Sequence, residues 1–125
     1  MRVTGLHVLA EIRDSDKEML QDLHQLETLM KDAAAENGFV VEDSVFHQYN
    51  QDGISGVLIV PDANLSIHTW PENGRVTVDM VACRENINLF SFCEDLASKF
   101  KAASMTAQYS KREIEVGSAS EAMAV

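Results

Sequence analysis

The sequence is short of several residue types, and each shortage excludes a class of protein. Proline occurs twice and apolar residues make up 46% of the 125 positions, so extensive disorder is not expected. Two cysteines, Cys83 and Cys93, are too few for a disulfide framework or a four-ligand zinc site. No apolar run approaches the roughly 18 residues of a membrane span, and the N-terminus lacks a signal-peptide core. These absences predict a cytoplasmic protein with reduced thiols, no metal and no membrane partner.

Basic residues are also few. Ten Lys and Arg residues against 20 Asp and Glu residues give a net charge of −10, which argues against nucleic acid as a partner. A chain of this length can bury about two-thirds of its unfolded surface in one core but is too short for two. We therefore expect a single domain over residues 1–117 and a flexible tail at 118–125, where small residues predominate.

Hydrophobic periodicity predicts an α+β fold with strands and helices in the order strand, helix, four strands, helix, strand. One amphipathic helix should start at Asp16 and stop at Asn37-Gly38, and a second should cover 88–102. The expected strands are 6–12, 39–49, 54–60, 65–70, 75–82 and 103–114. Hairpin turns in the middle of the chain favour an antiparallel sheet with both helices on one face, which is a two-layer sandwich.

Residues 65–72 hold the densest group of chemically useful side chains. A histidine, the only tryptophan, a proline and a carboxylate follow one another at the end of an expected strand, beside a glycine turn. Alternation places Ser66, His68 and Trp70 on one face of that strand, and Ile67 and Thr69 on the other. The pattern alone leaves two interpretations open: a ligand site, or a core tryptophan beside a hydrogen-bonded histidine.

The string Ser-Ile-His-Thr-Trp-Pro-Glu at 66–72 resembles the hallmark of the small bacterial and archaeal S-adenosylmethionine decarboxylases. The resemblance extends to Gly-Leu-His-Val-Leu-Ala-Glu at 5–11, Gly-Ile-Ser-Gly-Val at 53–57 and Val-Asp-Met-Val-Ala-Cys at 78–83. These separated motifs occur in the family's order over roughly residues 5–100. Such colinearity is more specific than any one motif.

The resemblance implies a proenzyme that cuts itself at a Glu-Ser bond, leaving a pyruvoyl group that captures the substrate amine and accepts electrons during decarboxylation. Ser55 and His68 match the pair that assists this cleavage. Cys83 matches the acid that reprotonates the substrate carbon.

The resemblance also implies a substrate pocket for S-adenosylmethionine or a close relative. Tyr49 stands where the family has an aromatic residue that stacks on adenine, and Trp70 is a second stacking candidate. Glu72 matches the carboxylate that binds the ribose hydroxyls, and Asp62 is included as a further substrate-binding candidate. Because family members build their sites near a dimer interface, a homodimer is expected.

One departure from the family concerns the processing site itself. The family's Glu-Ser-His appears as Asp62-Ala63-Asn64, and alanine has no oxygen with which to attack the Asp62 carbonyl. The expectation is an uncut chain with no pyruvoyl cofactor. Three functions stay open: a decarboxylase trapped unprocessed, a pyruvoyl-independent lyase that releases methylthioadenosine, and a non-catalytic partner of a related subunit. Asn64 slightly favours the lyase, because an engineered change would have altered Ala63 alone.

Overall fold

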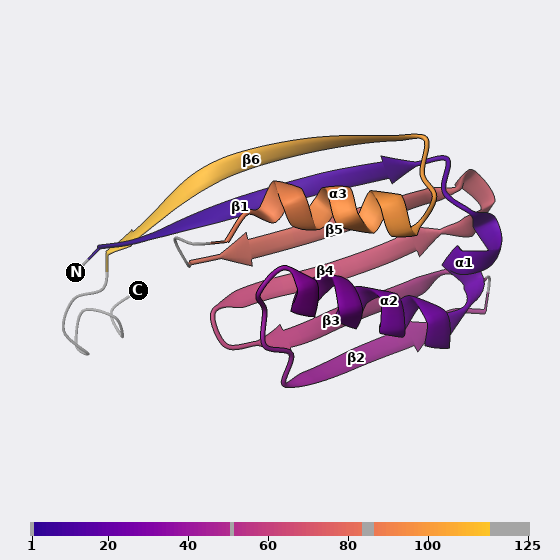
Figure 1. Ribbon diagram of the computed structural model, residues 1–125, viewed down its shortest axis with the longest axis horizontal. Helices are drawn as coiled ribbons and strands as arrows, with labels where there is room; N and C mark the ends of the chain where they lie inside the picture. The colour runs from indigo at the N-terminus through magenta and orange to yellow at the C-terminus, as the bar shows by residue number, and fades with distance from the viewer. Residues whose placement is uncertain (1, 51, 84–86, 116–125) are drawn as a thin grey trace.

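The computed structural model describes residues 2–50, 52–83 and 87–115 (Figure 1). Its strands are β1 (Arg2–Arg13), β2 (Asp43–Gln48), β3 (Ile54–Val60), β4 (Ala63–Trp70), β5 (Arg75–Ala82) and β6 (Ser104–Glu115). Its helices are α1 (Lys17–Gln21), α2 (Leu23–Glu36) and α3 (Leu89–Lys99), with one 3-10 turn, η1 (Pro71–Asn73). The strands form one antiparallel sheet in the order β2-β3-β4-β5-β1-β6.

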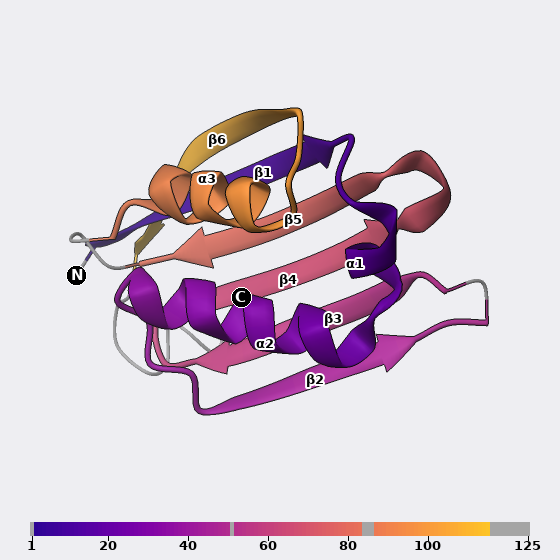
Figure 2. The same cartoon turned by 45° about the vertical axis from the view of Figure 1, so that its right-hand side comes forward.

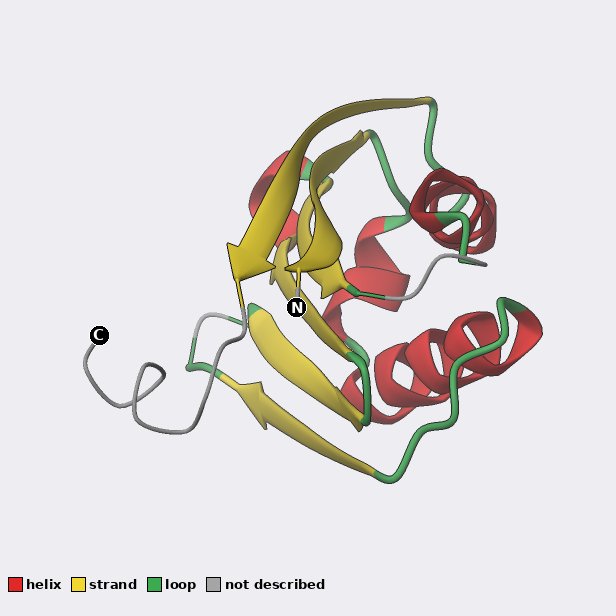
Figure 3. Ribbon diagram, turned by 90° about the vertical axis from the view of Figure 1, so that its left-hand side faces the viewer, coloured by secondary structure: helices red, strands yellow, loops and turns green. Residues whose placement is uncertain are grey.

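The helices cover one face of the sheet, which confirms the predicted α+β sandwich (Figure 3). Apolar side chains at helical spacing explain this arrangement. Leu26 and Met30 of α2 and Phe92 and Leu96 of α3 are fully buried against the sheet. Each such side chain contributes about 1.5–3 kcal/mol on burial. Figure 2 shows α2 and α3 running side by side over different halves of the sheet.

The opposite face of the sheet, which we call the open face, is covered by no helix among the described residues (Figure 3). Strand alternation sends every second side chain to it. Several of these side chains are apolar and well exposed: Leu9 (48%), Val45 (61%), Val57 (40%) and Ile59 (43%). The open face is thus a large, partly apolar surface.

The first expected helix is in fact two helices. Asp22 separates α1 from α2 with an extended backbone (φ −97°, ψ 99°), and its carboxylate accepts a hydrogen bond from the Gln25 amide at 3.0 Å. A carboxylate in this position caps the start of a helix and favours a new one. The apolar periodicity continues across the break, so it could not reveal it.

Several strand boundaries also differ from expectation. The first strand begins at Arg2, four residues before the expected start, because β1 pairs with β6 along its whole length. The second strand begins at Asp43, not Phe39, because Phe39 is buried, with its ring edge-to-face to Phe92 at 5.8 Å. The fourth begins at Ala63, which pairs with Val60, so the hairpin turn is two residues long. The tail at 118–125 lies outside the described residues. No helix in the described ranges is long and apolar enough to cross a membrane.

Candidate functional site

The hallmark string occupies β4 and η1, and strand alternation sorts its side chains as the sequence predicts. Ile67 and Thr69 are buried on the helix side, whereas Ser66, His68 and Trp70 lie towards the open face. The imidazole and indole rings lie next to each other, with centroids 4.3 Å apart. This part of the chain therefore presents polar and aromatic groups to solvent.

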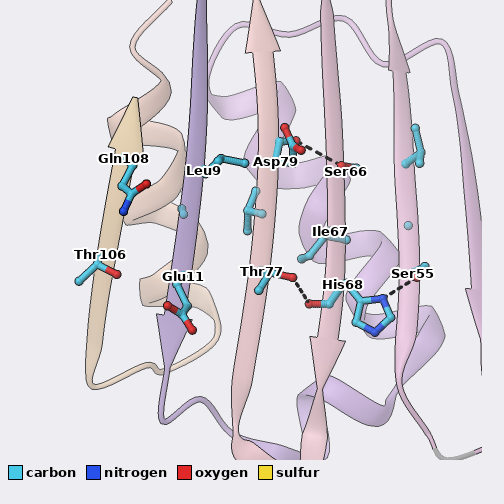
Figure 4. A pocket seen from close by; sticks show the side chains of 14 residues that line it. Leu9, Glu11, Ser55, Ser66, Ile67, His68, Thr77, Asp79, Thr106 and Gln108 are labelled. Carbon is cyan, nitrogen blue, oxygen red and sulfur yellow. Dashed lines mark hydrogen bonds between the residues drawn. The ribbon is translucent and has the colours of Figure 1, made fainter. Parts of the chain in front are cut away.

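A chain of hydrogen bonds links three of the predicted site residues. Ser55 of β3 pairs directly with His68 of the neighbouring strand β4, and its Oγ is 2.7 Å from His68 Nδ1 (Figure 4). The Tyr49 hydroxyl donates to the same Ser55 oxygen at 3.1 Å. Because Ser55 accepts from Tyr49, its own proton is available to an unprotonated Nδ1 of His68. The arrangement suits proton transfer between a hydroxyl and an imidazole.

A pocket of about 300 Å³ opens beside these groups. The Tyr49 and Trp70 side chains at its sides are 47% and 46% exposed. The His68 ring lies against both, at centroid distances of 5.8 and 4.3 Å, so the exposed parts of the two rings are what a planar ligand could contact. Glu72 lies in η1, which starts at Pro71 and ends at Gly74 in the left-handed conformation (φ 62°). The residues lining the pocket are Tyr49, Gly53, His68, Thr69, Trp70, Pro71, Glu72 and Asn73.

The remaining predicted residues gather at the other end of β4. Ala63 is the first residue of the strand and packs partly against the core. The Cys83 amide donates to the Asp62 carbonyl at 3.2 Å, and the Cys83 thiol is exposed. A Cβ atom at Gly5 would come within 3.1 Å of Cys83 Sγ, so glycine at this position leaves room for the thiol.

The structure thus divides the predicted site into two groups within one chain. Position 63 pairs with Val60, and His68 pairs with Ser55, five residues further along β4. At about 3.3 Å per residue, the two groups are roughly 17 Å apart. Tyr49, Trp70 and Glu72 lie with His68, whereas Asp62 and Cys83 lie with Ala63. The spacing within one strand was a signal for this division in the sequence.

The open face also carries charged pairs that the sequence analysis did not single out. His7 Nε2 lies 2.7 Å from Asp79 Oδ1. Glu11 contacts two arginines, Arg13 at 2.9 Å and Arg75 at 2.8 Å. Glu11 and Asp79 line a shallow groove of about 720 Å³ that crosses the sheet from β3 to β6 (Figure 4). His7 and Asp79, and Glu11 and Arg75, are distant in sequence and are brought together by the pairing of β1 with β5, whereas Arg13 lies two residues from Glu11 on β1. Among the described residues, no cluster of acidic, histidine or cysteine side chains could hold a metal ion.

The two cysteines should differ sharply in reactivity. Burial, with a smaller contribution from the Glu94 charge, raises the pKa of the Cys93 thiol to about 12, and its side chain is 0% exposed. We expect a thiol-specific disulfide reagent at pH 8 to modify Cys83 alone in the folded chain, and both cysteines after unfolding. Mass spectrometry of the intact chain measures this, with Cys83→Ser as the control that leaves nothing to label. Modification of Cys93 in the folded chain would contradict the packing of α3.

Comparison with known proteins assigns the chain to a family. The family model described as S-adenosylmethionine decarboxylase matches residues 6–113. Proteins named S-adenosylmethionine decarboxylase proenzyme from Pelotomaculum thermopropionicum and Moorella thermoacetica are both 41% identical to it, over 114 and 107 residues. The alignments cover 91% of this chain and 90% of the first relative, and 86% of each for the second. The chain belongs to the S-adenosylmethionine decarboxylase family.

A solved structure agrees on the fold. The crystal structure of the adenosylmethionine decarboxylase from Aquifex aeolicus superposes with a TM-score of 0.81 at 24% identity. The match covers 94% of this chain and 97% of that one.

The residue at position 63 does not fit the cofactor that the family resemblance implies. A pyruvoyl group forms from a residue with a side-chain oxygen, and Ala63 has only a methyl group, packed partly against the core. Ser66 is the nearest hydroxyl along the chain, but it lies within β4 and bonds to the Asp79 carbonyl at 3.3 Å. Position 63 therefore cannot supply a pyruvoyl group to a catalytic step.

Proposed function

We propose that this chain is a member of the S-adenosylmethionine decarboxylase family that stays uncut and binds S-adenosylmethionine, or a close relative, without forming a pyruvoyl group. The pocket between Tyr49 and Trp70, with the Glu72 carboxylate at its rim, carries this proposal. Without the group that accepts electrons, decarboxylation by the family route has no path. We also propose that the protein acts in the cytoplasm, as the sequence predicts.

The pocket has the chemistry that a nucleoside needs. Adenine is a planar ring system, and stacking a base on an aromatic side chain contributes about 1–3 kcal/mol. Tyr49 and Trp70 offer exposed ring faces for this purpose. A carboxylate such as Glu72 accepts hydrogen bonds from the paired hydroxyls of a ribose, and bonds to a charged acceptor are the stronger kind. Within one chain Asp62 lies at the far end of β4 from this pocket, so its negative charge would come near a cationic sulfonium substrate only if a second copy supplied it.

A homodimer would bring the two separated groups together. If two copies stack their open faces with antiparallel strands, the Ser55 and His68 end of one copy lies over the Asp62–Ala63 peptide and the Cys83 thiol of the other. The Ala63 side chain itself belongs to the helix side of β4, like Leu65. The exposed apolar side chains on this face favour such burial. Each composite site would then hold the Ser55–His68 pair, the Cys83 thiol and the aromatic pocket. Light scattering should report twice the chain mass of 13.8 kDa.

The intact Ser55–His68 pair supports a second candidate function. These two side chains are hydrogen-bonded at 2.7 Å and could assist attack by a hydroxyl at position 63, but every copy of this chain has alanine there. A relative with serine at that position would provide one, if it took the place of one copy in the dimer. In that role the chain would carry out no decarboxylation itself and would assist the processing of another subunit.

Ligand binding and product analysis test the main proposal together. Calorimetry should show that S-adenosylmethionine binds the unmodified chain, and that Glu72→Gln weakens binding by about tenfold or more through loss of a charged acceptor. Trp70→Ala should weaken it similarly through lost stacking. Glu94→Gln, an exposed carboxylate on α3, is the matched control and should bind normally.

The same incubations, analysed by liquid chromatography and mass spectrometry, separate the candidate reactions. Unchanged S-adenosylmethionine with an uncut chain is the expected result. Methylthioadenosine formed in proportion to the protein would identify the pyruvoyl-independent lyase instead. Absence of binding even at millimolar ligand would show that the pocket is wrongly assigned.

A further inference from the structure

Thr69 is the only buried polar side chain among those described, at 1% exposed. Its hydroxyl is fully used: it accepts from the Ile54 amide at 3.0 Å and donates to the Leu20 carbonyl at 3.0 Å. The first bond holds the start of β3, and the second ties β4 to the end of α1. A buried hydroxyl that satisfies two backbone groups in different elements fixes their relative position, because losing it leaves both groups unpaired.

A second hydrogen bond reaches the same end of α1 from another strand. The Gln48 side chain donates through Nε2 to the Gln21 carbonyl at 2.7 Å. The last carbonyls of a helix have no following turn to bond, and α1 is only five residues long. Leu20 is fully buried, which anchors this helix end in the core. The carbonyls of Leu20 and Gln21 are thus held by side chains from β4 and β2, two strands that are not neighbours in the sheet.

Both of these side chains adjoin the aromatic residues of the pocket. Gln48 directly precedes Tyr49, and Thr69 lies between His68 and Trp70. Because side chains alternate along a strand, Thr69 points to the helix layer while its two neighbours point to the open face. A bond made on the helix side therefore sets where the two rings lie on the ligand side.

We propose that Thr69 and Gln48 are positioning residues for the pocket. Both act by hydrogen bonding to the C-terminal end of α1, which holds β4 and β2 at a fixed separation. The end of α1 fixes the distance between the strand ends that carry Tyr49 and Trp70, and so sets how these two rings lie around His68 at the pocket. This inference rests on the proposed function for the identity of the ligand. The geometry of the pocket does not depend on the proposed function.

Trp70 is the only tryptophan of the chain, so tryptophan fluorescence reports directly on this pocket. Thr69→Val keeps the shape of the side chain and removes the hydroxyl, and Gln48→Met removes the donor with little change in length. Each should shift the Trp70 emission, increase its quenching by acrylamide, and weaken binding of both S-adenosylmethionine and methylthioadenosine by about tenfold, the cost of about one hydrogen bond. Thr69→Ser retains the hydroxyl and should restore emission, quenching and affinity.

Phe92→Leu is the matched control, because it weakens the core through α3 without touching α1 or the pocket. Compared at temperatures where all variants are equally folded, it should leave Trp70 fluorescence and affinity unchanged. The inference is overturned if Thr69→Val and Gln48→Met both retain normal quenching, or if Phe92→Leu or Thr69→Ser changes it as much as they do. Acrylamide quenching needs no ligand. If the unmodified chain bound neither ligand, the proposed function would be refuted, but quenching of the variants would still test whether Thr69 and Gln48 position Trp70.

Discussion

Ala63→Ser should convert an uncut chain into one that cleaves itself into residues 1–62 and 63–125. The new hydroxyl would lie next to the Asp62 carbonyl, whose oxygen already accepts a hydrogen bond from the Cys83 amide at 3.2 Å. That bond stabilises negative charge on the oxygen as the hydroxyl attacks, the C–N bond between residues 62 and 63 breaks and an ester forms. Loss of the α-proton of residue 63 then breaks the ester C–O bond and releases the Asp62 carboxylate, which separates the two fragments. The effect should be all or none: no detectable cleavage in the unmodified chain, and two fragments of the variant by intact mass spectrometry.

Ala63→Gly is the matched control, because it changes the same position without adding an oxygen. It should remain one chain, and Ala63→Ser combined with Ser55→Ala should cleave much more slowly than Ala63→Ser alone. An Ala63→Ser variant that folds and binds S-adenosylmethionine yet stays uncut would mean that the missing serine is not the only obstacle. Asn64, where the family has histidine, would then be the next position to restore.

Sequence periodicity predicted the order of strands and helices because each element has one apolar face and one polar face. It failed where a local polar interaction overrides that pattern, as at Asp22, whose carboxylate starts a new helix within one apolar stripe. It also failed at Phe39, where an apolar residue outside any strand fills the core against Phe92. Both errors come from contacts that periodicity does not encode.

The candidate site was predicted residue by residue, but its division was not. The resemblance to the family supplied Ser55, His68 and Cys83 as members of one site, and the five-residue spacing between positions 63 and 68 was the sign in the sequence that the site is divided within one chain. Strand register decides this, since it sets His68 opposite Ser55 and Ala63 opposite Val60. The hydrogen bond from Thr69 to the end of α1 could not be predicted from the sequence either, because it joins residues 49 positions apart.

The division of the site leads to the second large expected effect, which is cleavage between chains. Within one chain His68 is roughly 17 Å along β4 from position 63, too far to exchange a proton with a hydroxyl there. The double variant Ala63→Ser/His68→Ala should therefore stay intact as a homodimer. Refolded together with an excess of the unmodified chain, it should be cut, because the unmodified chain supplies His68 and the double variant supplies the serine.

The matched control replaces the unmodified chain with His68→Ala, which should leave the double variant intact at every mixing ratio. Mass spectrometry distinguishes the chains by their different masses, so the cut chain can be identified directly. If Ala63→Ser is cut normally when an excess of His68→Ala fills the other half of the dimer, the composite site does not exist. Cleavage of the double variant by the unmodified chain would show more than dimer geometry. It would show that this alanine-bearing chain can process a serine-bearing partner, the one activity that its retained Ser55–His68 pair is equipped to perform.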